Sequence, residues 1–350
     1  MTTQKITIDE LKPKFLGEAS RYNNWYHTAD FTYEGTEYCL KLSLTEGSLL
    51  GQQNFFSLSW DPVEIVQENG VAVLKKPKND INFVIDEDDF RFDAQNDQLI
   101  VEMGDMKVIS KEDQRRVISK NKNLELDLTL KPRGPIFYWG KEKGALCEVT
   151  EDTRVAGIES LSWANGTIKA NGKELVVDNA PGLFEHVWFG QLNFFQIRIM
   201  NWIYANFDQL YTYICHTESQ TNEGSPFHFE TGKVYLIDSD DYLFANKFEV
   251  VPESWVYFDE AKRFIPWEQS VDVRTDKGKL KYTIEPYRYP QLIQPPTRME
   301  DFMVDNIPGW NSLFYDLPVK LKGKFIFKDG EKLELTNGRG INELIRLVPL

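Results

Sequence analysis

Short strand-like segments recur along the chain at intervals of about ten residues, and this spacing constrains the fold more than any other feature. The segments are rich in aromatic and β-branched side chains, which suit the pleated surface of a sheet. The clearest case is Asn23 to Leu44, where two such segments flank Glu34-Gly35 and predict a hairpin. Regular spacing of this kind is typical of an antiparallel sandwich or barrel. We therefore expect an all-β fold, with at most one helical turn near Ile8 to Leu11.

An internal repeat indicates that the chain contains two copies of one β-domain. The chain has 350 residues, more than a single hydrophobic core usually organises. Gly172 precedes Glu185 by 13 residues, and Gly330 precedes Glu343 by the same 13. We expect each copy to be an antiparallel meander that closes into a small barrel and so leaves no exposed edge strand.

The starts of the two copies set the expected boundaries. An Asn-Trp pair opens an aromatic strand in both, at Trp25 and at Trp202. We predict a lead-in over residues 1–20, a first β-domain over 21–190 and a second over 191–350. The proline-rich run 289–310 reads as a long loop of the kind that often covers a binding site.

Charge and cysteine content exclude several classes of function. The net charge is −14 and the isoelectric point is near 4.9, which disfavours nucleic acid and anionic membranes as partners. No apolar run approaches the roughly 18 residues of a membrane span. Cys39, Cys147 and Cys215 are far apart and lack a Cys-x-x-Cys spacing, so neither a disulfide framework nor a zinc site is indicated. A reducing cytoplasm fits this pattern best.

Polar residues of chemical interest are concentrated in the aromatic-rich stretch from Gly182 to Asp208. Side chains two residues apart share one face of a strand, so His186 and Trp188 should lie together. The same period places four further residues on one face, namely Trp202, Tyr204, Asn206 and Asp208. We expect these residues to line a cavity, at or near the interface between the two domains.

Three stretches resemble the hydroxyneurosporene synthase family, which includes carotenoid 1,2-hydratases and kievitone-hydratase-like proteins. They are NNWYHTADFTYEGTEYCLKLSL, NGTIKANGKELVVDNAPGLFEHVWFG and KGKFIFKDGEKLELTNGRGINEL. The resemblance implies two tandem lipocalin-like barrels, an architecture also found in fungal decalin-forming Diels-Alderases. Only His186 and Trp188 fall on the family's His-x-Trp motif. The family usually has Asp where this chain has Glu185, and Phe189 separates Trp188 from Gly190.

The family resemblance implies hydration or dehydration of a double bond in a bulky polyene, terpenoid or prenylated molecule. Hydration of an alkene needs an acid, a base and a wall that tolerates positive charge. Glu185, His186 and Asp208 are the candidate acid and base residues. The candidate substrate-binding residues are Trp188, Trp202, Tyr204, Asn206, Tyr26 and His27.

Structural roles compete with these assignments. Glu185 has a counterpart in Glu343, so it is open to a purely structural role at the barrel closure. His186 has none, because Leu344 takes its place in the second copy, and this asymmetry favours function.

No cofactor or metal is expected. No glycine-rich loop precedes a helix, and His216 and His228 have no third ligand at metal spacing. The expected partner is a hydrophobic small molecule, bound by a monomer or homodimer. Two alternatives to a hydratase remain: a cyclase that folds a linear polyene, and a barrel that binds a ligand without reacting it.

Overall fold

The computed structural model describes residues 6–17, 21–47, 51–95, 97–140, 146–191, 197–261, 263–292 and 313–346. Within these ranges strands dominate, and the helices are one α-helix of four residues, α1 (Ile8–Leu11), and one 3-10 turn, η2 (Asp259–Ala261). The all-β prediction is therefore confirmed, as is the helical turn near the N-terminus. No helix in the described ranges has the length and apolar character to cross a membrane.

The chain divides into two compact units that do not follow a single cut in the sequence. The first contains Met1–Trp60 and Ile81–Gln196, and the second contains Asp61–Asp80 and Ile197–Leu350. The segment Asp61–Asp80 joins the second unit because its strand β5 (Val71–Lys75) pairs in parallel with β19 (Trp255–Phe258). This pairing is non-local, so no pattern within the segment itself signals it.

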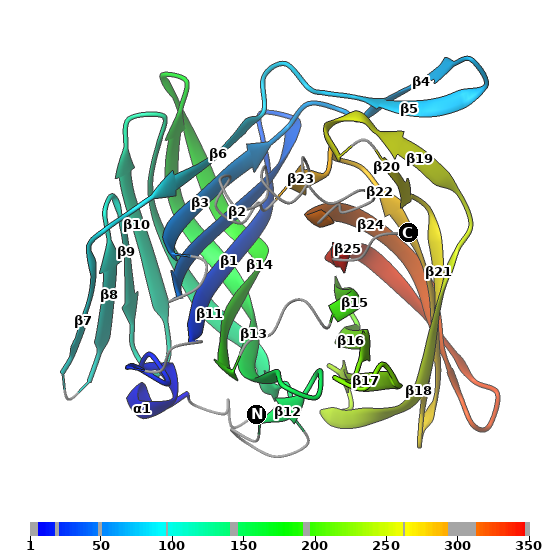
Figure 1. Ribbon diagram of the computed structural model, residues 1–350. Helices are drawn as coiled ribbons and strands as arrows, with labels where there is room; N and C mark the ends of the chain where they lie inside the picture. The colour runs from blue at the N-terminus through cyan, green and yellow to red at the C-terminus, as the bar shows by residue number, and fades with distance from the viewer. Residues whose placement is uncertain are drawn as a thin grey trace. The chain divides into compact units, whose positions relative to one another are not determined.

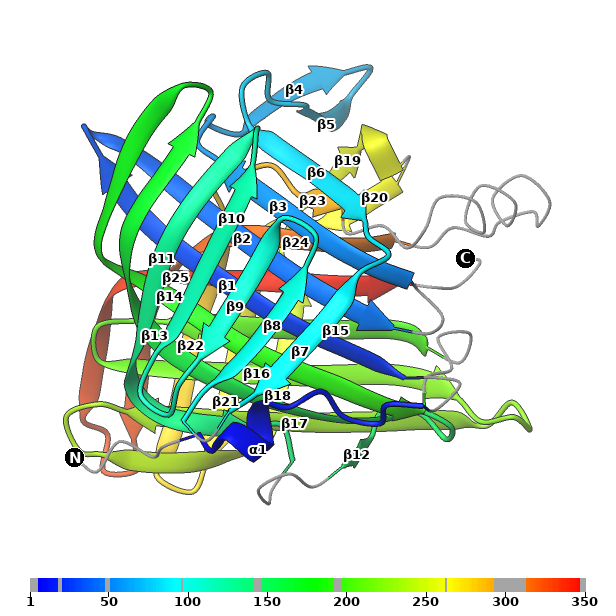
Figure 2. The same ribbon diagram turned by 90° about the vertical axis from the view of Figure 1, so that its left-hand side faces the viewer.

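The first unit is one strongly curled antiparallel sheet (Figures 1 and 2). Its strand order is β6-β3-β2-β1-β14-β13-β11-β10-β9-β8-β7, and β12 pairs with β13. The bounds are β1 Tyr22–Tyr33, β2 Thr36–Gly47, β3 Gly51–Ser59, β6 Ile81–Asp86, β7 Phe90–Ala94, β8 Leu99–Met103, β9 Met106–Ser110, β10 Arg115–Asn121, β11 Leu124–Tyr138, β12 Cys147–Glu148, β13 Arg154–Ala170 and β14 Lys173–Gln191. The predicted hairpin is β1 and β2, with Glu34 and Gly35 at positive φ in the turn.

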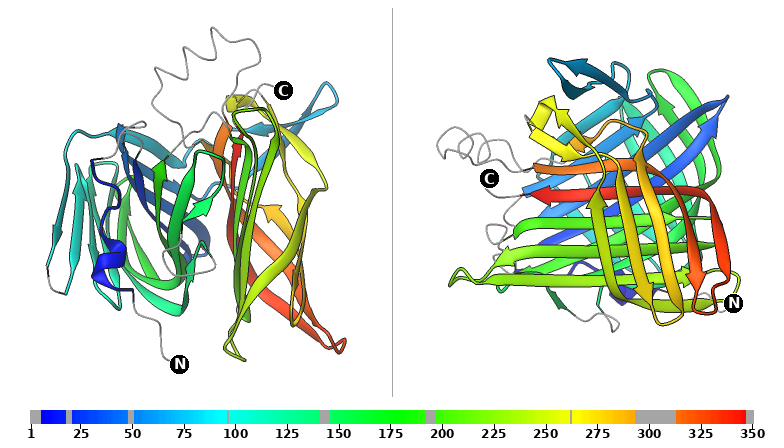
Figure 3. Two further views of the ribbon diagram at one scale, coloured as in Figure 1. Left: turned by 60° about the horizontal axis from the view of Figure 1, so that its bottom comes forward. Right: turned by 90° about the vertical axis from the view of Figure 1, so that its right-hand side faces the viewer.

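The second unit contains a closed barrel of eight antiparallel strands (Figure 3). The order β22-β21-β18-β17-β16-β15-β25-β24 closes because β22 also pairs with β24. The bounds are β15 Ile197–Asn206, β16 Leu210–Gln220, β17 Pro226–Leu236, β18 Asp241–Pro252, β21 Gln269–Thr275, β22 Gly278–Pro286, β24 Leu313–Phe327 and β25 Lys332–Arg346. The fold is thus two tandem barrel-like units, one curled and one closed, as predicted.

Short strands complete the second unit. They are β4 Glu64–Glu68, β5 Val71–Lys75, β19 Trp255–Phe258, β20 Arg263–Pro266 and β23 Gln291–Leu292. The first four form a separate small sheet, and β23 pairs with β24 at the start of the proline-rich run. From residue 293 to 312 that run lies outside the described residues, so its expected role stays a prediction.

The alternation of side chains decides which face of each strand enters the core. On β1, Trp25, Ala29 and Phe31 pack into the core of the first unit. On β15, Ile203 and its alternate neighbours Ala205 and Phe207 pack into the core of the second. Because neighbours on a strand point to opposite faces, Trp202 lies on the face of β15 turned away from that core.

The repeat is real at the closing strands, but its register differs by one residue from the one the sequence suggests. β1 pairs with β14 in the first unit, and β15 pairs with β25 in the barrel of the second. The equivalent cross-strand pairs are Glu185 with Tyr26 and Gly182 with Ala29 in the first unit, and Glu343 with Trp202 and Gly340 with Ala205 in the second. Trp25 therefore corresponds to Asn201 and not to Trp202. The shared Asn-Trp dipeptide is misleading because a shift of one residue reverses the face of every side chain.

Candidate functional site

An imidazole ring lies between two indole rings inside the first unit. Trp25 and His186 are cross-strand partners on β1 and β14, and their rings stack at 4.6 Å with an interplanar angle of 8°. Trp188, two residues along β14 on the same face, meets His186 at 4.9 Å. His186 is fully buried. Its orientation is fixed by aromatic packing from both sides.

A buried arginine lies near this aromatic stack. Arg115 begins β10, is 1% exposed, and places its guanidinium carbon 4.9 Å from the centre of the Phe184 ring. His27 also packs against Phe184, with the two ring centres 5.4 Å apart. The Nη1 group of Arg115 donates to the backbone carbonyls of Gln114, at 2.8 Å, and Lys111. Among the described residues, its Nε and Nη2 groups have no hydrogen-bond partner.

Burial sets the charge states of these three groups. Burial, together with the charges of Lys14 and Arg115, lowers the pKa of His186 to about 3, and a backbone hydrogen bond with Glu10 opposes this shift. Burial, followed by the charge of Arg115, lowers the pKa of His27 to about 3 as well, and a backbone hydrogen bond with Trp25 opposes it. Burial lowers the pKa of Arg115 to about 9, although Asp113 opposes this shift. At neutral pH the site therefore holds two neutral imidazoles beside one guanidinium cation.

Neither histidine is held by an ordinary hydrogen bond. Within the described part of the chain, both ring nitrogens of His27 and both of His186 are buried without a partner of normal geometry, although the backbone of Trp25 approaches His27 and that of Glu10 approaches His186. Buried polar groups are normally paired, so orphaned ones need an explanation. Together with the two orphaned N–H groups of Arg115, they form a set of donors and acceptors that suits a polar group of a ligand.

The N-terminal segment covers this end of the sheet. Thr7 and Glu10 form a capping box around α1, and the second carboxylate oxygen of Glu10 accepts a hydrogen bond of 2.9 Å from the Tyr138 hydroxyl on β11. Leu11 is fully buried in the core of the unit. The Nζ atom of Lys14 lies 5.7 Å from the Trp188 ring. The described part of the lead-in, to which the sequence assigned no role, therefore packs against the first unit, and Figure 2 shows α1 at the lower end of its sheet.

A cavity of about 380 Å³ opens beneath this segment. It is lined by Glu10, Lys14, Phe15, Tyr138, Leu146, Ile158 and Trp188. His186 lies one step further inside, since it pairs across the sheet with Ile158 and contacts Trp188. Trp188 therefore both lines the cavity and contacts His186.

The residues that the sequence singled out separate into groups. His186, Trp188 and His27 share the inner face of the first unit. Glu185 and Tyr26 are cross-strand partners on the opposite face of the same two strands. The side chains of Glu185 and His186 therefore cannot act on one atom of a substrate held inside the first unit.

The remaining sequence candidates belong to the second unit. Trp202 and Tyr204 stack at 6.2 Å on the face of β15 turned away from the barrel core, and Asn206 shares that face. Asp208 lies in an exposed turn, where its Oδ2 atom accepts from Thr336 at 2.9 Å and from Asn337 at 2.6 Å. Asp208 thus connects the bend that follows β15 with Thr336 and Asn337 on β25.

The sequence analysis missed Arg115, Tyr138 and Glu10. A local signal existed for Arg115, because in RRVISKN it alternates with Val117 and so falls on the buried face of the strand. No such signal exists for the other two. Glu10 and Tyr138 are 128 residues apart, and only the folded chain brings them together.

Comparison with known proteins shows the fold. No family model matches the chain, and no curated protein matches its sequence significantly. Kievitone hydratase from Nectria haematococca superposes with a TM-score of 0.63 at 11% identity, covering 99% of this chain and 94% of its own. CghA, solved with Sch210972, gives 0.61 at 9% identity, covering 95% and 90%. A candidate AttH from Nitrosomonas europaea gives 0.60 at 13% identity, covering 96% and 100%. The architecture that the sequence resemblance implied is confirmed.

Proposed function

We propose that the protein is a cofactor-free enzyme that hydrates a carbon–carbon double bond, or removes water to form one, in a bulky and mostly apolar small molecule. The observation that carries the proposal is the buried Arg115, with two unpaired N–H groups, beside the neutral and unpaired His186. An uncompensated buried charge is costly. A ligand oxygen that accepts hydrogen bonds from it would recover part of that cost.

The arrangement suits a double bond conjugated to a carbonyl group. Arg115 donates to the carbonyl oxygen, and His186 takes a proton from water as the water oxygen bonds to the distal alkene carbon. The electron pair of the double bond moves to the carbonyl oxygen as an enolate, which Arg115 stabilises. The imidazolium formed on His186 then protonates the carbon next to the carbonyl, and the enolate collapses. Dehydration is the same sequence in reverse.

Electrostatics favour this route over hydration of an isolated alkene. Protonation of an isolated alkene produces a carbocation, and the guanidinium of Arg115 would repel that cation inside the same apolar core. In the conjugate route the imidazolium on His186 forms together with an enolate anion, and the guanidinium attracts that anion. The proposed substrate is therefore a polyene, terpenoid or prenylated molecule that carries a conjugated carbonyl.

Cyclisation is a second candidate, and the aromatic packing favours it. Trp25, His186 and Trp188 form a stiff wall against which a linear polyene would hold one conformation. Holding reactive ends together lowers a barrier by about 7 to 11 kcal/mol in the best cases. Arg115 would polarise a carbonyl on the reacting alkene, and no proton would move.

The names of the structural neighbours support action on an organic small molecule. One is named as a hydratase, and another was crystallised with the small molecule Sch210972. These likenesses are of fold, and they add to the geometry of Arg115 and His186 without replacing it.

The test begins with mass spectrometry of organic extracts from the purified protein, which identifies a carried-over ligand. That compound, or its hydrated or dehydrated partner, is then incubated in H₂¹⁸O. For a hydratase we expect ¹⁸O in the product, loss of about 10² to 10⁴ in rate for His186→Ala, and a milder loss for Trp188→Phe. His228→Ala, a histidine on an exposed part of β17, is the control. An unlabelled product that has lost one water relative to the substrate indicates dehydration, whereas an unlabelled product of the same mass as the substrate contradicts both directions and favours cyclisation. Binding without turnover favours a carrier.

A further inference from the structure

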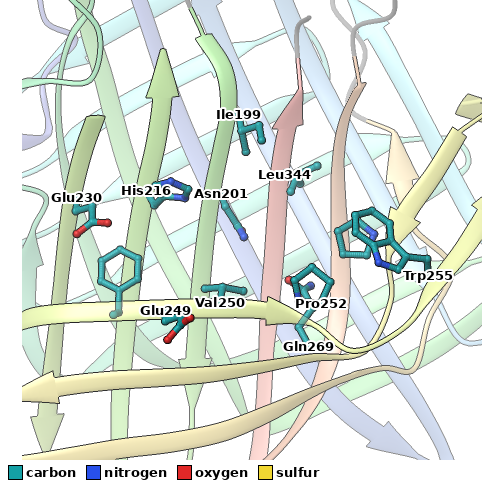
Figure 4. A pocket seen from close by; sticks show the side chains of 12 residues that line it. Ile199, Asn201, His216, Glu230, Glu249, Val250, Pro252, Trp255, Gln269 and Leu344 are labelled. Atoms are coloured by element: carbon teal, nitrogen blue, oxygen red, sulfur yellow. The ribbon is translucent and has the colours of Figure 1, made fainter. Parts of the chain in front are cut away.

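The closed barrel of the second unit contains a cavity of its own, independent of the site in the first unit. The cavity has a volume of about 280 Å³. Its apolar lining includes Ile199, Phe248, Val250, Leu344 and Trp255, and its polar lining includes Asn201, His216, Glu230 and Gln269 (Figure 4). All of these residues belong to the second unit.

The cavity occupies the same topological place as the Trp25–His186 stack of the first unit. Asn201 on β15 corresponds to Trp25 on β1. Leu344, the cross-strand partner of Asn201 on β25, corresponds to His186 on β14. Where the first unit fills this end of the sheet with two large rings, the second has smaller side chains. The difference in side-chain size leaves room for a ligand at the mouth of the barrel.

The polar side of the cavity is rich in groups that accept hydrogen bonds. Asn201 is 9% exposed, projects toward the cavity, and its side-chain oxygen has no hydrogen-bond partner among the described residues. Across the sheet, Asn201 pairs with His216, which in turn pairs with Glu230. Glu218 lies 3.3 Å from the Nε2 atom of His216. No lysine or arginine is among the described residues that line the cavity.

An exposed indole completes the rim. Trp255 on β19 is 46% exposed, although tryptophan usually buries most of its surface. Its ring offers a face for an aromatic ligand or a cation. The apolar wall, the unpaired amide oxygen of Asn201 and the carboxylates of Glu230 and Glu249, which both line the cavity, together select one kind of ligand.

We propose that this barrel mouth is a second ligand site, and that it binds an organic ammonium ion with an apolar or aromatic body. The body would pack against Val250 and Leu344, and the ammonium group would donate to Glu230 and to the Asn201 oxygen. This proposal does not depend on the function proposed for the first unit.

The test uses three probes with one ring system and different charge: naphthylmethylammonium, naphthalenemethanol and naphthaleneacetate. Calorimetric titration of the full-length protein should show the ammonium binding about tenfold more tightly than the alcohol, and the acetate more weakly than both. Glu230→Gln should weaken ammonium binding about fivefold, the most that one exposed ion pair contributes, and leave alcohol binding unchanged. Asn201→Leu should weaken all three probes by filling the cavity.

Two controls locate the effect. Glu174→Gln neutralises an exposed glutamate on β14 and should change nothing. His186→Ala, in the first unit, should also leave ammonium binding unchanged, which separates this site from the proposed catalytic one. The proposal is overturned if no probe binds, if the alcohol binds as tightly as the ammonium, or if Glu230→Gln weakens both probes equally.

Discussion

Three side chains inside the first unit are placed at a cost to stability. Arg115 is a buried cation without a carboxylate partner among the described residues, and His27 and His186 are buried without hydrogen bonds of normal geometry. Replacement of any of the three by an apolar side chain of similar size would stabilise the fold. Such costs are typical of functional sites, where selection retains groups that the fold does not need.

Arg115→Met tests this trade between stability and function. We expect the free energy of unfolding to stay the same or rise by about 1 kcal/mol or more, because the variant removes a buried unpaired charge. Ligand binding in the first unit should fall at least tenfold. Urea unfolding and ligand titration on the same preparation measure both quantities. Marked destabilisation would show that the two carbonyl contacts of Arg115 matter more than its burial.

The two histidines predict a loss of stability in mild acid. The pKa of His27 is about 3 in the folded protein and about 6.5 when unfolded, so the unfolded chain binds a proton that the folded chain does not. Protonation of His27 in the unfolded chain therefore leaves the free energy of unfolding unchanged above about pH 6.5 and lowers it progressively as the pH falls toward 3. Between pH 7 and pH 5 each such histidine should remove about 2 kcal/mol from the free energy of unfolding.

Between pH 7 and pH 5, the free energy of unfolding of His27→Leu should therefore fall by about 2 kcal/mol less than that of the natural protein. Chemical denaturation at pH 7 and at pH 5 provides the comparison. His228→Leu, on an exposed strand, serves as the control and should show the natural protein's pH dependence. An unchanged difference for His27→Leu would mean that His27 is hydrated or protonated in the folded state.

At the scale of elements, the N-terminal segment is a structural part of the first unit. Its α1 helix has only four residues, too few to be stable alone. It depends on tertiary contacts: the burial of Ile6 and Leu11, the bond from Tyr138 to Glu10, and the paired hydrogen bonds between Asn23 and the backbone of Lys14. The segment therefore contributes to the cavity wall only while these contacts hold.

Tyr138→Phe removes one of these contacts with little change in shape. We expect a cost of about 1 kcal/mol and faster hydrogen exchange at the amides of Thr7 and Glu10. Hydrogen exchange measured on peptides that cover α1 reports the exchange rate of these amides directly. Tyr33→Phe is the matched control, since the Tyr33 hydroxyl has no hydrogen-bond partner among the described residues. Equal exchange in both variants would show that apolar packing alone holds the segment.

At the scale of the whole molecule, a glycine allows close backbone contact between β1 and β14 in the first unit, and another does so between β15 and β25 in the second. A β-carbon added at Gly182 would lie 2.4 Å from the Thr28 carbonyl oxygen, and one at Gly340 would lie 2.1 Å from that of Tyr204. Backbone approaches this close exclude any side chain. The equivalence of the two glycines is the strongest structural trace of the repeat, because both sites need the same close contact.

Gly182→Ala and Gly340→Ala should each cost about 3 kcal/mol through overpacking, but in different units. We expect hydrogen exchange to accelerate first in β1 and β14 for Gly182→Ala, and in β15 and β25 for Gly340→Ala. Gly330→Ala, where an added β-carbon meets open space at a positive φ, should cost only about 1 kcal/mol. Loosening of the same strands by both close-contact variants would contradict the separate cores of the two units.

The sequence by itself determined the class of fold, the first hairpin, the short N-terminal helical turn and the repeat of the closing strands. These follow from local signals: alternation with a period of two, turn residues, and glycines at fixed spacing. It also identified His186 and Trp188 as a pair, because two residues on one strand share a face. Such information is contained within a few neighbouring residues.

Only the tertiary structure decided which residues face one another across strands. Register placed Trp25 beside His186 and moved Glu185 to the other face, since a shift of one residue reverses every side chain. It also brought Tyr138 to Glu10, which is 128 residues away in the sequence, and packed Arg115 against Phe184. Pairings of this kind depend on the packing of the whole core, and no local pattern specifies them.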